Sequence, residues 1–458
     1  MYRMQRKISA ELLAWKKREN RKPLVLRGAR QVGKTWAVEE FGRVHFKNVV
    51  KINFEERIEL RSIFKDFDVN RILDELSILF SASLTPGETL LFFDEIQMCP
   101  EAIASLRYFY EKRPDLHLIA AGSLLDFTLK EMNYAMPVGR VEFCYMYPMN
   151  FKEFLLALSQ KRLVSYLENF TPEDNFSELI HRKLLEYLRT YLFVGGMPEA
   201  VKIYAGQKQF GEVERTISNI LTALQYDFAK YGTKQQQEHL LSVFRYCGRN
   251  VGKKVKYTNI NRDVRSENLK QAFHRLQLSR IVHLVQHTSA GQIPLMNGVK
   301  EKIYKPVFLD VGLANGLSGV RLIDPGEIMT NNEGALAEQF IGQELLTVEP
   351  PYVDSRLFYW TREKRSSNAE IDYVFQRNAS VFPIEVKAGK TGALKSLQVY
   401  LFEKRLRTGV RFNLDLPSIG TFRTKVNARK NQEKIEFQLL SLPLYMCSQL
   451  PRIIDGLS

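Results

Sequence analysis

The feature that most constrains this chain is a glycine-rich segment between a short apolar run and a helical pattern. The apolar run ends at Leu26, and the segment from Gly28 to Thr35 reads G-x-x-x-x-G-K-T before it continues as TWAVEEFG. In such a strand–loop–helix context, consecutive backbone N–H groups can wrap phosphate oxygens at a helix N-terminus. The pattern predicts a P-loop in an α/β fold, and the residues expected to bind ATP are Gly28, Ala29, Arg30, Gln31, Val32, Gly33, Lys34 and Thr35.

Individual residues of this loop have distinct expected tasks. Gly28 and Gly33 allow backbone angles and close approaches that a Cβ would block. Lys34 would reach the β and γ phosphates, and the Thr35 hydroxyl would complete the oxygen shell of Mg²⁺. We therefore expect ATP and Mg²⁺ as the cofactors.

A second apolar run, ETLLFFDE, ends in the carboxylate pair Asp94 and Glu95. Asp94 would hold Mg²⁺ through water, and Glu95 would polarise the attacking water as a general base. The alternative is an acidic pair on the surface, but carboxylates that end a buried strand are costly unless they have a use. The two motifs together predict Mg²⁺-dependent hydrolysis of a nucleoside triphosphate.

Length and composition indicate an ordinary globular protein with several domains. The chain has 458 residues, of which 45% are hydrophobic and 26% charged, and this predicts about three domains and excludes a disordered chain. No apolar run approaches the roughly 18 residues that cross a bilayer. The four cysteines are far apart, so neither a disulfide framework nor a thiolate zinc site is indicated. We expect a cytoplasmic protein that does not enter a membrane.

The net charge of +15 is concentrated in two segments. Residues 245–305 carry 13 basic and 3 acidic side chains, and residues 381–458 carry 13 and 6. Such local surpluses are typical of modules that bind polyanions, and we expect DNA as the partner. The alternative is a pair of solvated basic faces without a ligand.

Six motifs, in this order, resemble the predicted bacterial and archaeal AAA-family ATPases that carry a C-terminal domain of unknown function, DUF4143. They are LRGARQVGKT, FFDEIQ, AAGSLLDF, PVGRVEF, YPMNFKEFL and YLFVGGMPEAV, and the resemblance covers nearly the whole chain. It implies an α/β protein with a P-loop AAA+ core, a helical lid, a winged-helix module and a PD-(D/E)XK nuclease-like domain that ends in an added strand. We expect these four parts at residues 1–160, 161–234, 235–320 and 325–458.

The resemblance adds two candidates for catalysis. Ser123 ends the buried strand LHLIAAGS, where the AAA+ class has its sensor residue between the acidic strand and the γ-phosphate. Arg140 precedes the strand VEFCYMYP, where that class has an arginine that faces the nucleotide of a neighbouring subunit. This second role requires a homo-oligomer, and the alternative is a structural arginine within one subunit.

The middle of the chain contains a glycine–proline corner and a helical pattern with a hairpin. In the family, Gly195-Gly196-Met197-Pro198 looks like the lid turn that closes on the adenine; the alternative is a simple helix-breaking turn. Residues 235–315 predict three helices and a strand pair, which is the winged-helix order. The third helix, from Ser266, has a polar face suited to phosphates and base edges, with Asn268, Lys270, Gln271, His274 and Arg275. The alternative is that this module docks on a partner without touching DNA.

The C-terminal part predicts a helix, three strands and a helix that carry a D…E-x-K arrangement. Asp372 lies in AEIDYVFQR, and Glu385 and Lys387 fall on one face of SVFPIEVKAGK. The two carboxylates would hold Mg²⁺, and Lys387 would orient or deprotonate a water. This resembles the PD-(D/E)XK nuclease superfamily, in which Glu338 would match an extra acidic ligand. The alternatives are a salt-bridge ladder of Glu385 with Lys387 and Lys390, and a fold that serves only as a binding platform.

The sequence thus predicts an ATPase that couples hydrolysis to nucleic-acid binding or processing, with nuclease activity left open. The alternative function is an ATP-gated switch or adaptor that acts on a protein partner and has an inactive nuclease-like domain. The single E-x-K signature does not separate the two.

Overall fold

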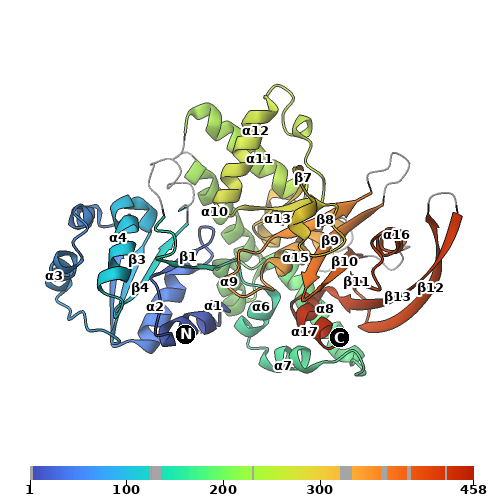
Figure 1. Ribbon diagram of the computed structural model, residues 1–458, viewed down its shortest axis with the longest axis horizontal. Helices are drawn as coiled ribbons and strands as arrows, with labels where there is room; N and C mark the ends of the chain where they lie inside the picture. The colour runs from blue at the N-terminus through green and yellow to red at the C-terminus, as the bar shows by residue number, and fades with distance from the viewer. Residues whose placement is uncertain are drawn as a thin grey trace.

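The computed structural model describes residues 4–123, 125, 136–228, 232–319, 333–362, 369–388, 394–428 and 431–457. In these ranges the chain forms a parallel sheet, a helical middle and a larger mixed sheet, in that order (Figure 1). No helix there is long and apolar enough to cross a membrane. The four cysteines are buried and free, which confirms that they form no disulfide.

The first sheet has five parallel strands in the order β2-β3-β4-β1-β5. They are β1 (Leu24–Arg27), β2 (Asn48–Asn53), β3 (Thr89–Asp94), β4 (His117–Gly122) and β5 (Glu142–Tyr145). Because parallel strands all end at the same edge, the loops after β1, β3 and β4 lie together there. This arrangement brings the P-loop, the Asp94–Glu95 pair and Ser123 to one edge of the sheet.

Helices cover both faces of this sheet, as the apolar runs of its strands require. Leu24 and Leu26 pack in one cluster with α1 (Ile8–Lys17) and α2 (Lys34–His45). Val25 points to the other face and packs in a second cluster with α3 (Val69–Phe80) and α4 (Pro100–Lys112). A short 3-10 helix, η1 (Ile58–Phe64), completes this second face.

The middle of the chain is helical, as the sequence predicts. Its first part has α6 (Phe151–Ala157), α7 (Lys161–Asn169), α8 (Glu178–Val194), α9 (Pro198–Gln207) and α10 (Phe210–Phe228). The second part has α11 (Lys234–Arg249), α12 (Ser266–Leu278) and α13 (Val311–Ser318). The short helix expected between α11 and α12 is only one 3-10 turn, η3 (Tyr257–Asn259).

The second sheet has eight strands in the order β12-β13-β11-β10-β9-β8-β6-β7. They are β6 (Val282–Thr288), β7 (Val299–Phe308), β8 (Leu357–Thr361), β9 (Glu370–Arg377), β10 (Ser380–Val386), β11 (Thr408–Asn413), β12 (Ser418–Ala428) and β13 (Asn431–Pro443). The helix α15 (Glu333–Leu346) packs on one face and α16 (Lys395–Lys404) on the other. The added C-terminal strand is β13, and the chain then ends with η6 (Leu444–Gln449) and α17 (Leu450–Asp455).

The hairpin expected to be the wing does not stand apart from the C-terminal sheet. Its strand β6 pairs in parallel with β8, with Val285 opposite Leu357, and with β7 on its other side. The expected boundary between the winged-helix and nuclease-like parts therefore runs through one continuous sheet. No local pattern predicts this pairing, because it joins residues about 70 positions apart.

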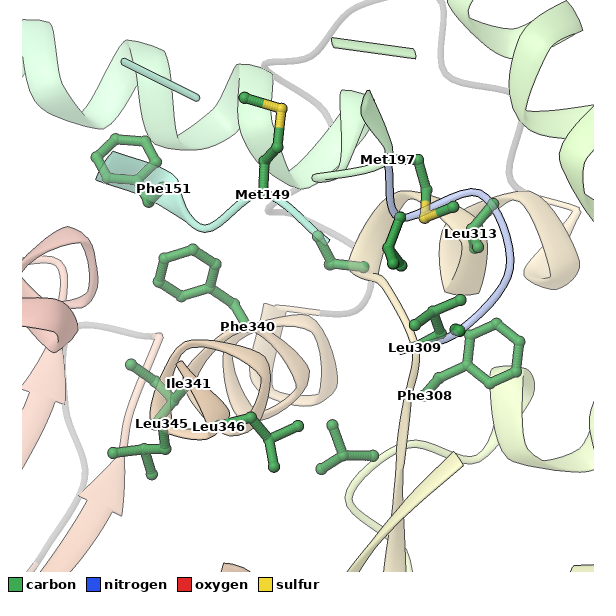
Figure 2. Packing of buried hydrophobic residues seen from close by; sticks show 14 of the residues in the cluster. Met149, Phe151, Met197, Phe308, Leu309, Leu313, Phe340, Ile341, Leu345 and Leu346 are labelled. Carbon is green, nitrogen blue, oxygen red and sulfur yellow. The ribbon is translucent and has the colours of Figure 1, made fainter. Parts of the chain in front are cut away.

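One apolar core runs from the first sheet through the helical middle into the second sheet. Figure 2 shows Phe151, at the start of α6, facing Phe340 of α15, and their ring centroids are 6.2 Å apart. Tyr191 of α8 contacts both rings edge-on. The helical middle and the C-terminal domain are thus packed on each other through aromatic side chains.

Candidate nucleotide site and C-terminal carboxylate cluster

The P-loop has the backbone geometry that its glycines permit. Gly33 has a φ of 90° and precedes the first residue of α2. A Cβ at Gly28 would lie 2.3 Å from the carbonyl oxygen of Met146, so only glycine fits beside the end of β5. The loop therefore presents its N–H groups at the N-terminus of α2, where the helix dipole favours an anion.

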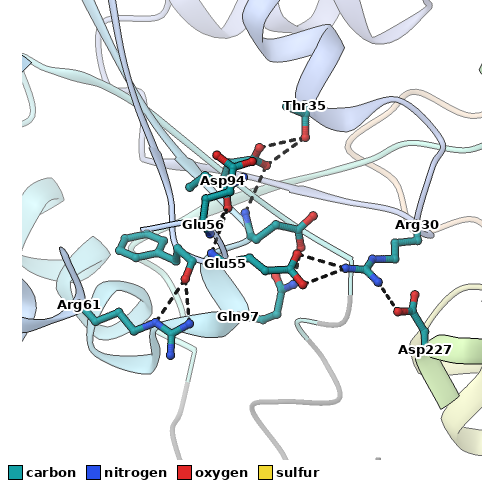
Figure 3. A network of polar contacts seen from close by, with 11 residues as sticks. Arg30, Thr35, Glu55, Glu56, Arg61, Asp94, Gln97 and Asp227 are labelled. Carbon is teal, nitrogen blue, oxygen red and sulfur yellow. Dashed lines mark hydrogen bonds and ion pairs between the residues drawn. The ribbon is translucent and has the colours of Figure 1, made fainter. Parts of the chain in front are cut away.

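Lys34, Thr35 and Asp94 meet inside this loop. The Lys34 ammonium donates to the carbonyls of Gly28 (3.0 Å) and Ala29 (2.9 Å). The Thr35 hydroxyl lies 3.1 and 3.0 Å from the two carboxylate oxygens of Asp94, as Figure 3 shows. Hydroxyl and carboxylate oxygens side by side are the hard donors that Mg²⁺ prefers, so these two residues fit a magnesium ion.

Burial shifts the pKa values of both charged groups. Burial lowers the pKa of Lys34 to about 8, and the carboxylates of Glu95 and Asp94 oppose this shift. Burial and the neighbouring Glu95 raise the pKa of Asp94, while Lys51 lowers it. A buried ammonium beside two carboxylates is an arrangement that gains stability when phosphate oxygens arrive.

Glu95 and Ser123 lie at the same sheet edge and show signs of a functional site. Glu95 has a φ of 50°, which is uncommon for a residue with a side chain, and its carboxylate accepts a hydrogen bond from the Gln97 amide. The Ser123 hydroxyl and the other amide atom of Gln97, Oε1, are buried without a hydrogen-bond partner among the described residues. Buried polar atoms in this state are costly, and they indicate a place for a polar ligand.

Arg30 differs from the other P-loop residues because its side chain leaves the loop. It forms an ion pair with Asp227 of α10 and lies 3.2 Å from Glu55, which follows β2 (Figure 3). The sequence analysis assigned Arg30 to the phosphate cradle, where its backbone remains. Its guanidinium instead ties the P-loop to the helical middle.

Arg140 has a partner within its own subunit. Its Nε donates to Glu111 of α4 at 3.0 Å, and its side chain is 44% exposed. This contact belongs to the structural alternative raised above, and the role toward a neighbouring subunit stays a prediction.

Arg6 of the N-terminal segment contacts the P-loop and pairs with Glu153 of α6, and neither residue was predicted from the sequence. The Arg6 guanidinium donates to the carbonyls of Val32 (2.8 Å) and Tyr147 (2.7 Å) and to the Glu153 carboxylate (3.1 Å). The two side chains are only 3% and 8% exposed. They are 147 positions apart, so no local pattern could have paired them.

The glycine–proline corner is more than a helix-breaking turn. A Cβ at Gly195, whose φ is 72°, would lie 2.0 Å from an Asp310 carboxylate oxygen, and one at Gly196 would lie 2.0 Å from the Met149 carbonyl. The Gly196 N–H donates to Asp310 at 2.6 Å. The next residues begin α9 at Pro198, whose ring carbon lies 3.5 Å from where a Cβ of Gly33 would be. The corner therefore lies against the P-loop, and its role as a lid turn that closes on the adenine stays a prediction.

In the C-terminal domain, the structure brings the predicted residues together. Val386 N–H donates to Asp372 at 2.7 Å, and Lys387 lies 2.6 Å from Glu385. The pairing register of β9 and β10, which sets Tyr373 opposite Ile384, places Asp372 and Glu385 next to each other at its end. Burial raises the pKa of Glu338 of α15, Lys305 lowers it, and the charge of Asp372 raises it. The expected contact with Lys390 lies outside the described residues.

The cluster also contains three residues that the sequence analysis did not include. Lys305 of β7 lies 2.9 Å from Glu338 and 2.5 Å from Glu370, and Lys254 lies 2.9 Å from Glu370. Both lysines belong to the basic segment 245–305, so part of its surplus is neutralised inside the protein. A lysine next to the apolar end of a strand, in YKPVF, was the one signal that could have suggested a buried role.

Two of the three carboxylates expected to bind a metal ion are paired with lysines. Glu338 is paired with Lys305, Glu385 with Lys387, and Asp372 accepts from a backbone amide. Within the described ranges, no three His, Cys, Asp or Glu side chains surround one point as metal ligands do. Lysine ammonium groups thus contact Glu338 and Glu385, and the magnesium site expected from Asp372, Glu385 and Glu338 stays a prediction.

The polar face of α12 is present as predicted. Lys270, Gln271 and His274 are exposed, and Asn268 is half-buried. Arg275 turns toward α11, where it donates to Gln236 at 3.3 Å. Four of the five residues thus remain at the surface, and Arg275 has a partner within the chain.

Comparison with known proteins identifies the two ends of the chain. Residues 20–155 match a family model described as an AAA domain, and residues 333–428 match a domain of unknown function, DUF4143. Residues 185–323 match another domain of unknown function, DUF8612, which spans the boundary expected between lid and winged helix. An uncharacterized protein of Methanocaldococcus jannaschii is 31% identical over 184 residues, which are 39% of this chain and only 36% of that protein.

Several solved structures have low overall similarity to this chain. The ORC2 protein of Aeropyrum pernix, solved in ADPNP-ADP complexes, has a TM-score of 0.34 at 11% identity and covers 70% of this chain and 94% of its own. RuvB of Thermotoga maritima has a TM-score of 0.30 at 16% identity, covering 65% and 91%. AMPPCP-bound DnaA from Aquifex aeolicus has a TM-score of 0.21 at 11% identity, covering 59% and 85%.

The family matches agree with the geometry of the first sheet. The AAA match contains the P-loop, the Asp94–Glu95 pair and Ser123, which meet at one sheet edge. The DUF4143 match contains Glu338, Asp372 and the Glu385–Lys387 pair. The chain therefore contains an N-terminal AAA domain, which carries the P-loop, and a C-terminal DUF4143 domain.

Proposed function

We propose that the protein is an Mg²⁺-dependent ATPase that couples its nucleotide state to nucleic-acid binding by its C-terminal half. The observation that carries this proposal is the pair of neighbouring residues Arg6 and Lys7. Arg6 binds the P-loop carbonyl of Val32, and Lys7 binds the end of α15, the helix that carries Glu338. One short segment thus contacts both the nucleotide site and the C-terminal domain.

Hydrolysis is assigned to residues that meet at the edge of the first sheet. The P-loop amides and Lys34 bind the phosphates, and Thr35 and Asp94 hold Mg²⁺, which would neutralise charge on the β and γ phosphates. Glu95 takes the proton of the attacking water. Ser123 donates its hydroxyl, which has no other partner among the described residues, to the γ-phosphate.

The link to the C-terminal domain consists of three exposed hydrogen bonds from Lys7 and one buried hydrogen bond to Glu344. The Lys7 ammonium donates to the carbonyls of Thr347 (2.5 Å), Val348 (3.1 Å) and Glu349 (2.8 Å) at the end of α15. On the same helix, Glu344 accepts from the Phe151 N–H at 2.8 Å. Because ATP binding acts on the loop that Arg6 holds, a shift of that loop is passed to α15 through the contacts of Arg6 and Lys7.

The nucleic-acid surface is assigned to the exposed basic residues around α12. Arg262, Arg265 and Lys270 are exposed there, while Lys254 and Lys305 of the same basic segment serve the carboxylate cluster. A second basic surface lies on the long β12–β13 ribbon at the far end of the sheet (Figure 1), which carries Arg423 and Lys425. Both would bind phosphates without reading sequence.

A second candidate function is a nucleotide-gated switch that acts on a protein partner and has an inactive nuclease-like domain. It is favoured by one observation: the carboxylates expected to hold a catalytic metal are paired with Lys305 and Lys387. In this function the basic residues around α12 would not bind DNA.

The proposal is tested by the fluorescence anisotropy of labelled single-stranded and duplex DNA, with ADP or a non-hydrolysable ATP analogue bound. We expect DNA affinity that depends on the nucleotide. The variant Arg262→Ala/Lys270→Ala should bind more weakly, and the slope of log affinity against log salt should decrease by about 2. The matched control is Lys161→Ala/Arg162→Ala, which removes the same charges from exposed positions of α7. Equal behaviour of the two variants, or no DNA binding by the wild type, favours the switch.

A further inference from the structure

The carboxylate cluster of the C-terminal domain contains a lysine that comes from outside the D…E-x-K pattern. Lys305 lies on β7, at the edge of the second sheet, and is only 1% exposed. Its ammonium lies 2.9 Å from Glu338 and 2.5 Å from Glu370. It also lies 5.0 Å from the centre of the Tyr359 ring, a distance typical of a cation–π contact.

Neighbouring carboxylates and the loop after α11 hold Lys305 in this position. Glu338 and Glu370 attract it directly, and the charge of Asp372 adds to the field. A Cβ at Gly252, whose φ is 72°, would lie 2.4 Å from the second carboxylate oxygen of Glu338, so the loop after α11 closes over this pair. A buried ammonium is stable only with such partners, because an unpaired buried charge is very costly.

The cluster nevertheless retains a polar atom that nothing satisfies. The side chain of Glu385 has an exposed fraction of only 6%. One of its oxygens binds Lys387 at 2.6 Å, and the other has no hydrogen-bond partner among the described residues. Asp372 lies beside it in the pairing register of the two strands. The cluster thus has oxygen donors to spare for a cation, while its nearest cation is already part of the chain.

We propose that Lys305 is a built-in cation that keeps divalent metal ions out of this cluster. A metal ion can bind Asp372 and Glu385 only when the Lys305 ammonium has left Glu338 and Glu370. The proposal rests on the assignment of this cluster as the functional site of the C-terminal domain. It assigns the regulation of metal entry to β7, a strand that lies outside the DUF4143 match and within the residues matched by DUF8612.

The charges support exclusion by competition. Glu338, Glu370, Asp372 and Glu385 are four carboxylates, and Lys305 and Lys387 contact three of them. A divalent ion placed beside an ammonium in a site of low dielectric is repelled by it. Lys305 also pairs with Glu338, which was expected to be an additional metal ligand. Removal of Lys305 alone leaves excess negative charge on the carboxylates, which a divalent ion would neutralise.

The test is Mn²⁺ binding by the full-length chain without nucleotide, followed by the loss of the free-Mn²⁺ signal in electron paramagnetic resonance. The wild type is expected to show no Mn²⁺ site that depends on Asp372. The variant Lys305→Met is expected to gain about one Mn²⁺ per chain with at least a tenfold higher affinity. The gain should disappear in Lys305→Met/Asp372→Asn.

Two controls keep the outcome clear. Lys254→Met also removes a partner of Glu370, but Lys254 is 40% exposed at the rim, so this variant should gain no Mn²⁺. Lys305→Met/Glu370→Gln removes one charge of each sign and serves if Lys305→Met does not fold. Binding of a fluorescent ATP analogue to each variant shows that the P-loop domain is intact.

The proposal is overturned if the wild type binds Mn²⁺ at a site that Asp372→Asn abolishes. It is equally overturned if both folded variants at Lys305 gain no Mn²⁺. Neither result depends on DNA binding or ATP hydrolysis, so a failure here is distinct from a failure of the proposed function.

Discussion

The Arg6 side chain offers the sharpest test of how the P-loop is held. Its guanidinium has three partners, the carbonyls of Val32 and Tyr147 and the Glu153 carboxylate. We predict that Arg6→Met destabilises the protein and weakens ATP binding, whereas most exposed arginines could be replaced without effect.

The size of the effect follows from what each partner keeps. Breaking a buried ion pair costs about 3–5 kcal/mol when the remaining charge is left alone. Glu153 still accepts hydrogen bonds from the N–H groups of Lys7 (2.6 Å) and Asn150 (3.0 Å), so we expect the lower end, about 3 kcal/mol. If the chain of 458 residues unfolds as one unit, this lowers Tm by about 3 °C.

The assay is thermal unfolding together with titration of a fluorescent ATP analogue, for wild type, Arg6→Met and Arg6→Lys. Arg6→Lys keeps the charge but loses the planar fork, so its loss of stability should be about half that of Arg6→Met. The loss of the Val32 contact should weaken ATP binding by about tenfold in Arg6→Met, because the loop is no longer held ready for phosphate. Unchanged Tm and unchanged ATP affinity in Arg6→Met would refute the reasoning.

Three further predictions concern buried groups. Burial raises the pKa of Glu344 to about 8. Its contribution to stability is therefore present below about pH 4.5 and is lost as pH rises toward 8, at up to about 1.4 kcal/mol per pH unit. Urea unfolding across pH 5–9 should show this decline in the wild type, and Glu344→Gln should lack it. Because the pKa of Lys34 is about 8 and phosphates favour its charged form, the protein should take up about half a proton when it binds ATP at pH 8. Calorimetry in buffers of different ionisation enthalpy measures this uptake, and its absence would contradict the prediction. Gly195→Ala should lower the free energy of unfolding in urea by about 3 kcal/mol, because of the positive φ of Gly195 and the displacement of Asp310. Gly206→Ala, where a Cβ would have nothing within 4 Å, should not destabilise the protein. Equal effects of the two substitutions would contradict the close approach at Gly195.

The nucleotide site could be predicted from sequence because its parts are local and follow strands. Gly28 to Thr35, the Asp94–Glu95 pair and Ser123 each come directly after a buried strand, and parallel strands end at one edge. Arg6 could not be predicted, since its partners Tyr147 and Glu153 are more than 140 positions away.

The second sheet shows the same limit in a different way. The strands and the E-x-K pair follow from alternation and spacing, but β6 and β7 join this sheet through pairings between distant segments. As a result, Lys305 entered the count of a basic surface although it is buried among carboxylates. Asp310 had a readable signal, because it precedes a helix and caps it through the Leu313 N–H, but its contact with Gly196 had none.

The proposed function requires that ATP hydrolysis at the P-loop is coupled to DNA binding by the basic C-terminal half. It is tested most directly by steady-state ATP hydrolysis with and without DNA, for wild type, Glu95→Gln and Lys34→Ala. We predict that DNA raises the wild-type rate of ATP hydrolysis and that Lys34→Ala binds ATP poorly. Glu95→Gln should bind ATP, but its rate of hydrolysis should be lower than that of the wild type by a factor of about 100 or more. A slow wild-type rate that is the same with and without DNA would contradict the claim.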